Sequence, residues 1–292
     1  MGAGGVYWAW ATADGLRVEA FTTDGERLWH ADLGRYECEH GFGASVATWN
    51  DLVIVPIDHE GPSAVVALDA TTGRERWRLA RESARTAYST PLVLERAGEP
   101  PLVVLASQAH GLTGVDPRTG RVLWERRCFP RRTVSSPLVV DGLVIGTCGE
   151  GGGDNLLVAL RLPPAAAGPD AAPREPEVAF SLDRSVAPYV PTPVRSGGRL
   201  YLWGDRGVVT CVSALDGTQL WRGRVGGTFS ASPIVAGGAV INVSADGEVV
   251  AIADGAEFRE LGRTGLGETT RATPAVAGDR LILRSVGHLF SL

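Results

Sequence analysis

Short apolar runs separated by glycine-containing turns recur along the whole chain. The stretches 138–145, 194–202 and 234–242 each contain two apolar runs divided by such a turn. A third run follows, as in 63–69 and 207–212, and then a Thr-Gly or Asp-Gly turn and a fourth run. Because these runs are short, are bounded by turn residues and lack a sustained helical period, the pattern predicts an all-β protein built from antiparallel strands.

A tryptophan recurs in the fourth run, with a glycine four residues before it. The copies lie at intervals of about 48 residues, a period that indicates a repeat architecture, and the last interval is twice as long. Phenylalanine replaces tryptophan in two weaker copies, at Phe180 and Phe258. The Phe180 copy is displaced by a Pro- and Ala-rich insertion, 163–176, whose composition predicts a surface loop. The four full copies end at Trp29, Trp77, Trp124 and Trp221.

A second sequence marker recurs with the same period as the tryptophan and precedes the innermost strand of each repeat. It has Ser or Thr at its centre in six copies, and proline follows in five of them. Four strands in roughly 45 residues is the pattern of a β-propeller blade. The copies are 44–46, 89–91, 135–137, 191–193, 231–233 and 272–274.

The repeats predict one β-propeller domain, 1–292, of about seven four-stranded antiparallel blades. Five blades are complete, and the two terminal ones have three strands each. The chain therefore forms either a seven-bladed propeller or an eight-bladed propeller that lacks its beginning. The blades are expected near 1–34, 41–80, 85–128, 131–182, 187–225, 227–262 and 268–292.

The repeated glycine and tryptophan are predicted to be structural. A glycine supplies the positive φ that a tight hairpin turn requires. A large planar ring at a fixed place in every blade fills the space between adjacent blades, and ligand-binding residues seldom repeat with the scaffold. Trp29, Trp77, Trp124 and Trp221 are therefore interpreted as docking residues between blades.

The segment Ala67-Leu-Asp-Ala-Thr-Thr-Gly-Arg-Glu-Arg-Trp77 resembles the tryptophan-docking repeat of the pyrroloquinoline-quinone (PQQ)-like β-propellers. The copy that ends at Trp124 is similar, and the resemblance covers essentially the whole chain. Within that family the chain is most similar to exported bacterial PQQ-binding-like repeat proteins and to the propeller lipoprotein of outer-membrane assembly. The resemblance implies a periplasmic or exported protein if an N-terminal portion precedes this sequence.

The resemblance to full quinoprotein dehydrogenases is weaker. Those enzymes imply bound PQQ and Ca²⁺, an adjacent Cys-Cys pair, an Asp base, and Glu and Asn metal ligands. Here Cys38, Cys128, Cys148 and Cys211 are far apart, and no acid and amide match the metal site by motif. No cofactor is expected, and PQQ with Ca²⁺ belongs only to the enzyme alternative.

The composition and charge of the chain limit the classes of partner that it is expected to bind. The 28 basic and 33 acidic residues give a net charge of −5 and are spread without long blocks, which argues against nucleic acid. No apolar run approaches the roughly 18 residues of a membrane span, and the N-terminus has no signal-peptide pattern. The cysteines are predicted to be buried thiols.

The local sequence motifs give only weak signals for a metal-binding, phosphate-binding or catalytic site. Asp58-His59-Glu60 places three metal-ligand types together, but a solvated loop is the favoured interpretation. The Gly-rich segment 149–155 is interpreted as a hairpin turn because no helix follows it to bind phosphate. No catalytic, cofactor-binding or metal-binding residue is predicted.

Segments that lead into the innermost strands are expected to meet at one mouth of the propeller channel. Their arginines and aromatic residues suit a small anionic ligand, such as a carboxylate, sulfate or sugar acid, or a protein partner. In the alternative interpretation they are loop charges paired with Glu39 and Glu268. The candidate contacts are His40, Arg85, Tyr88, Arg132, Tyr189, Phe229 and Arg271.

The favoured function is a non-catalytic binding or scaffolding module that presents loops to a protein or a small polar ligand. The alternative is an enzyme with a site in the central channel, either a quinoprotein-like oxidoreductase or a carbohydrate-active hydrolase.

Overall fold

A computed structural model describes residues 4–151, 153–163 and 174–292, and within these ranges the chain forms strands and no helix. The strands make seven sheets, in which strands consecutive in the sequence are hydrogen-bonded neighbours. Five sheets have four strands, and the first and last have three. This confirms the predicted class, an all-β propeller of four-stranded blades with a partial sheet at each end. Most of the predicted insertion 163–176 lies outside the described residues.

The bounds of the strands follow the repeat. The first three sheets contain β1 (Val6–Thr12), β2 (Gly15–Phe21) and β3 (Arg27–Asp32); β4 (Ala47–Trp49), β5 (Leu52–Ile57), β6 (Ser63–Asp69) and β7 (Glu75–Arg81); and β8 (Leu92–Leu94), β9 (Leu102–Ser107), β10 (Gly111–Val115) and β11 (Val122–Arg126). The fourth contains β12 (Leu138–Val140), β13 (Leu143–Glu150), β14 (Gly153–Arg161) and β15 (Glu177–Leu182). The last three contain β16 (Val194–Ser196), β17 (Arg199–Trp203), β18 (Val208–Ser213) and β19 (Gln219–Arg224); β20 (Ile234–Ala236), β21 (Ala239–Val243), β22 (Glu248–Ala253) and β23 (Glu260–Gly265); and β24 (Ala275–Ala277), β25 (Arg280–Arg284) and β26 (Leu289–Ser291).

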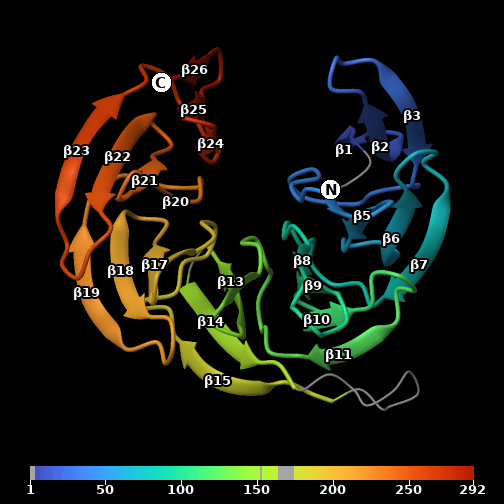
Figure 1. Ribbon diagram of the computed structural model, residues 1–292, viewed down its shortest axis with the longest axis horizontal. Coiled ribbons are helices and arrows are strands. Elements are labelled where there is room, and N and C mark those ends of the chain that lie inside the picture. Colours follow the sequence, from blue (N-terminus) through green and yellow to red (C-terminus); the bar gives the residue numbers. More distant parts are fainter. Residues whose placement is uncertain (1–3, 152, 164–173) are drawn as a thin grey trace. The chain divides into compact units, whose positions relative to one another are not determined.

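The chain divides into two compact units. The first comprises Met1–Val139 and Leu160–Glu177, and the second comprises Val140–Ala159 and Val178–Leu292. Within each unit the sheets follow one another in chain order (Figure 1). The first strands of neighbouring sheets lie side by side, β4 beside β8 in the first unit and β16 beside β20 in the second.

Burial on both faces explains why the inner strands are apolar without alternation. In β5 all six residues are buried. Val53 and Val55 pack toward the first sheet, whereas Leu52 and Ile54 pack toward the third. A strand covered on both faces needs apolar residues at every position, because successive side chains point to opposite faces.

Each innermost strand that follows a proline marker begins at the next residue. Strands β8, β12, β16, β20 and β24 start directly after Pro91, Pro137, Pro193, Pro233 and Pro274. Proline has no N–H to donate to a sheet, so the ladder begins only after it.

The Ser or Thr at the centre of the marker joins neighbouring sheets. The N–H of Ser45 donates to Thr90 Oγ1 at 3.0 Å, and the N–H of Thr90 donates to Ser136 Oγ at 3.1 Å. The second unit repeats the arrangement, from Thr192 to Ser232 at 2.9 Å and from Ser232 to Thr273 at 3.0 Å. The recurring hydroxyl is therefore an acceptor between sheets, which the sequence did not reveal.

The repeated tryptophan also reaches the next sheet. The indole N–H of Trp29 donates to the carbonyl of Ala70 at 2.9 Å, and that of Trp77 donates to the carbonyl of Pro117 at 2.8 Å. In the second unit Trp221 donates to the carbonyl of Gly255 at 3.0 Å. Trp124 is buried in the first unit, 4% exposed.

Candidate functional site

Four of the predicted contact residues come together in the first unit around one carboxylate. Glu39 lies 3.2 Å from Arg85, 3.5 Å from Arg132 and 3.7 Å from His40. The Arg132 guanidinium lies 5.9 Å from the centre of the Tyr88 ring. Burial raises the pKa of Tyr88, and the nearby Arg132 partly offsets that effect. An anionic ligand at this place has to compete with Glu39 for the two arginines.

The remaining predicted contacts lie in the second unit and do not gather in the same way. Phe229 is 1% exposed and packs edge-on against Trp203, so its ring offers no surface to a ligand. Arg271 is exposed. Glu268 pairs with His288 at 2.7 Å and not with Arg271 among the described residues. Hydrogen bonds from Ser285 and from the Gly287 N–H hold the pKa of Glu268 below its ordinary value.

Tyr189 alone among the predicted contacts lines a pocket of about 340 Å³ in the second unit. The pocket is formed by the β13–β14 hairpin, the β15–β16 connection, the β17–β18 turn and the strands that carry them. In antiparallel sheets these connections lie at the same end of the strands. Its polar lining residues are Glu150, Asn155, Arg184, Ser185, Tyr189, Asp205, Arg206, Thr210 and Arg222.

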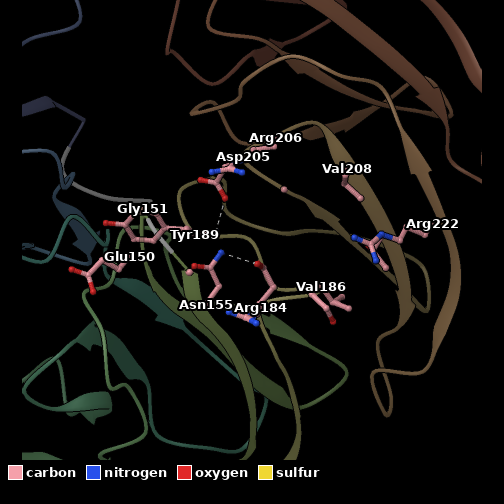
Figure 2. A pocket seen from close by; sticks show the side chains of 15 residues that line it. Glu150, Gly151, Asn155, Arg184, Val186, Tyr189, Asp205, Arg206, Val208 and Arg222 are labelled. Atoms are coloured by element: carbon pink, nitrogen blue, oxygen red, sulfur yellow. Dashed lines mark hydrogen bonds between the residues drawn. The ribbon is translucent and has the colours of Figure 1, made fainter.

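Hydrogen bonds between the backbone and two side chains, Asp205 and Asn155, hold the β15–β16 connection at this pocket. The two carboxylate oxygens of Asp205 accept the N–H groups of Tyr189 at 2.9 Å and Val190 at 3.0 Å. Asn155 Nδ2 donates to the carbonyl of Ala187 at 3.1 Å (Figure 2). A β-carbon at Gly149 would lie 2.7 Å from the Tyr189 ring, so a glycine is required for the hairpin and this ring to approach. The loop is fixed before any ligand arrives.

Three arginines surround the pocket. Figure 2 shows Arg184, Arg206 and Arg222 on three of its sides, each from a different segment. Within the described ranges none of the three lies within ion-pair distance of a carboxylate. Local motif reasoning missed this group, because the three positions share no spacing in the sequence.

The segment 58–60 differs from the prediction of a solvated loop. Asp58 and His59 are buried, and only Glu60 is exposed. The Asp58 carboxylate binds Arg81 at 2.7 Å. The imidazole of His59 stacks on Tyr36 at 4.8 Å, with its Nδ1 accepting the Glu37 N–H at 2.9 Å. These side chains are buried because partners distant in the sequence satisfy their polar groups.

The sheets and their docking residues define the chain as a PQQ-like β-propeller. It belongs to the family described as "Outer membrane protein assembly factor BamB", whose model matches residues 14–161 and 177–292. No curated protein sequence matches the chain.

Solved structures show the same fold at low sequence identity. BamB from Moraxella catarrhalis has a TM-score of 0.74 and 17% identity, covering 99% of this chain and 78% of that one. A europium-containing methanol dehydrogenase has a TM-score of 0.69 and 13% identity, covering 97% and 71%. Quinohemoprotein alcohol dehydrogenase from Comamonas testosteroni has a TM-score of 0.66 and 14% identity, covering 96% and 61%. At these identities the likeness shows the fold and not an activity.

Among the described residues no group of three or more His, Cys, Asp or Glu side chains is placed to hold a metal ion. No two cysteines are adjacent, and burial raises the pKa of Cys211 to about 11. The described ranges also contain no helix of the length and apolarity needed to cross a membrane.

Proposed function

We propose that this propeller is a non-catalytic binding or scaffolding module that presents the loops around the second-unit pocket to a protein partner. One observation carries the proposal. Three exposed arginines surround a pocket whose loops are already fixed by Asp205 and Asn155. A preformed rim of this kind loses little conformational freedom on binding.

The arrangement favours binding over hydrolysis. Glu150 and Asp205 are the two carboxylates of the pocket. Both oxygens of Asp205 accept backbone N–H groups, so this side chain serves the loop and is poorly suited to activate a water molecule. A carbohydrate-active site needs two carboxylates committed to the reaction. The pocket supplies at most one of them.

We also propose that the protein works outside the cytoplasm. The support is the family description, which names an outer-membrane assembly factor. Fractionation of cells that express the full gene product from its own locus tests this. Recovery of the protein only with cytoplasmic markers would refute it.

Site-specific photo-crosslinking in the native cell tests the binding function. A photoreactive residue is placed at Ser185, on the β15–β16 connection, or at Leu215, which is 69% exposed in the β18–β19 turn at the opposite end of the sheet. We expect one protein to be crosslinked from Ser185 and not from Leu215, and to bind the purified chain in calorimetry. Equal crosslinking from both positions would contradict the proposal.

The enzyme alternative is tested with the same purified chain. The chain is incubated with PQQ and Ca²⁺ and assayed for dye-linked alcohol oxidation. We expect no turnover above the protein-free control. Turnover that depends on PQQ would replace the binding function with an oxidoreductase.

A further inference from the structure

The three arginines of the second-unit pocket have no carboxylate within ion-pair distance among the described residues. Asp183 adjoins Arg184 in sequence, but its carboxylate accepts the N–H and the hydroxyl of Ser185, at 2.9 and 2.5 Å. Asp205 adjoins Arg206, but its oxygens accept the N–H groups of the β15–β16 connection. These hydrogen bonds do not remove the negative charge of either carboxylate, and after the bonds from Ser185 the charge of Arg184 helps to lower the pKa of Asp183. Neither acid forms an ion pair with its neighbouring arginine among the described residues, so each guanidinium can still bind another anion.

Some other exposed arginines of the same unit pair with carboxylates, whereas Arg224, Arg259 and Arg284 do not among the described residues. Arg263 binds Glu248 at 2.8 Å and Glu260 at 2.7 Å, and Arg195 binds Asp141 at 2.6 Å. The protein as a whole carries a net charge of −5. The pocket lining has three arginines against two carboxylates, Glu150 and Asp205, so its formal charge is positive in a protein whose net charge is negative. A positive field of this kind attracts an anionic partner.

The placement of the arginines indicates the form of the anion. A guanidinium binds a carboxylate through two parallel N–H donors. Arg184, Arg206 and Arg222 come from a connection, a turn and an outer strand, and lie on different sides of the pocket (Figure 2). A single small anion touches one side at a time, whereas several carboxylates spaced along a chain reach them together.

The volume of the pocket limits what enters it. At about 340 Å³ it lies at the small end of the range for ligand sites. It has room for one or two acidic side chains but not for a folded element. Ser185 and Thr210 add hydroxyl groups to the lining.

We propose that the second-unit pocket binds an acidic peptide segment of the protein partner, with one or two of its acidic side chains inside the pocket and its carboxylates paired with Arg184, Arg206 and Arg222. The inference rests on the proposed binding function and names the chemistry of the segment that the pocket recognises.

Fluorescence anisotropy with labelled peptides of alternating Glu and Gly tests the inference, with a Gln-Gly peptide of equal length as the uncharged probe. The full chain is used at about 50 mM salt, where exposed charges are weakly screened. We expect the Glu peptide to bind at least about tenfold more tightly than the Gln peptide, because only carboxylates make charge-assisted bonds with arginine. Equal binding of the two peptides would overturn the proposal.

A matched pair of variants tests the site. The triple substitution Arg184→Ala, Arg206→Ala and Arg222→Ala removes the pocket charge. Its control replaces three exposed arginines outside the pocket lining, Arg224, Arg259 and Arg284, with the same change in net charge. We expect the pocket variant to bind the Glu peptide at least about tenfold more weakly and the control to stay within about twofold of wild type. Similar losses in both variants would show general attraction and refute the site.

Competition separates a peptide site from a site for small anions. Inorganic phosphate and citrate are titrated against the bound Glu peptide at constant ionic strength. We expect displacement only at concentrations far above those of unlabelled peptide. Displacement by either small anion at the peptide's own concentration would overturn the peptide assignment.

The crosslinking experiment distinguishes the two proposals when peptide binding fails. A specific crosslink from Ser185 without Glu-peptide binding would refute the acidic-peptide inference and leave the binding function standing. Loss of both would refute both. Circular dichroism and urea unfolding of each triple variant confirm that it is folded.

Discussion

Gly73 lies directly against the indole ring of Trp29 from the preceding sheet. A β-carbon at Gly73 would stand 2.6 Å from Trp29 Cε3, and the φ of this glycine is +71°. The same contact recurs between Gly120 and Trp77, again at 2.6 Å. Gly73 and Gly120 thus have a second function besides the turn, since each makes room for the tryptophan ring of the previous sheet.

Replacing Gly73 with alanine is expected to destabilise the protein by about 2 to 4 kcal/mol. About 1 to 2 kcal/mol comes from the left-handed backbone and the rest from overpacking against the ring. Gly25→Ala is the matched control, because Gly25 has a φ of +88° and a β-carbon added there would meet nothing within 4 Å. Urea unfolding measures both. Equal losses in the two variants would show that the ring contact contributes nothing.

Ser232→Ala is expected to cost about 1 kcal/mol, because the N–H of Thr192 loses its acceptor at 2.9 Å. Ser232→Thr keeps a hydroxyl at the same place and should recover most of the loss. Urea unfolding at neutral pH compares the three proteins. An alanine variant as stable as wild type would mean that the hydroxyl between sheets does not hold them.

Arg81→Met is expected to cost about 3 to 5 kcal/mol, because it leaves the charge of Asp58 buried without a partner. The side chains of this pair are 1% and 7% exposed. The double variant Asp58→Leu with Arg81→Met should lose less than the single one, since no charge is then stranded. A double-mutant cycle in urea measures this. If Arg81→Met alone were as stable as the double variant, or more stable, the expectation would be contradicted.

Asp254 should make stability depend on pH in the acid range. Burial alone would raise its pKa, but hydrogen bonds from Ser196, Tyr201 and Arg199 hold the pKa of Asp254 below its ordinary value of 3.8. Tyr201 donates to it at 2.6 Å and Arg199 at 2.9 Å. A lowered carboxyl pKa stabilises the fold above pH 3.8 and loses that effect as the pH falls through the lowered value.

Asp254→Asn is therefore expected to cost about 2 kcal/mol at pH 7 and clearly less near pH 3. Urea unfolding of wild type and variant at both pH values checks the sign. The control is Asp246→Asn, because Asp246 is exposed and its side chain makes no hydrogen bond in the described part of the chain. If the stability that Asp254→Asn loses were larger near pH 3 than at pH 7, the stabilising role of the ionised Asp254 would be refuted.

The sheets were predictable because their signals are local. A proline followed by an apolar run predicted the start of β8 and β12, and a Gly-containing turn separated each pair of strands. Every repeat needs the same turns and strand starts, so the pattern found in one repeat strengthens the prediction for the others. The hairpin at 149–155 was predicted for the same reason, although its part in lining the pocket was not.

The site was less predictable because its contacts join distant residues. Asp58 appeared solvated in the sequence, yet Arg81 from another strand makes its burial possible. Arg184, Arg206 and Arg222 occupy three kinds of local structure and share no motif. The sequence predicts Tyr189 as a contact only because it is an aromatic residue that precedes an innermost strand. The three arginines can be recognised as a group only in the folded structure, where their segments lie around one pocket.

In both units the hydrogen bonds from a backbone N–H to the hydroxyl of the next marker run in one direction along the chain. Thr90 accepts from Ser45 and donates to Ser136, and Ser232 stands in the same relation to Thr192 and Thr273. The sheets that contain Thr90 and Ser232 thus each have a donor on one side and a matching acceptor on the other. Because this pair belongs to the repeat itself, duplication of such a repeat in the gene would also duplicate the hydrogen bond that joins its sheet to the next.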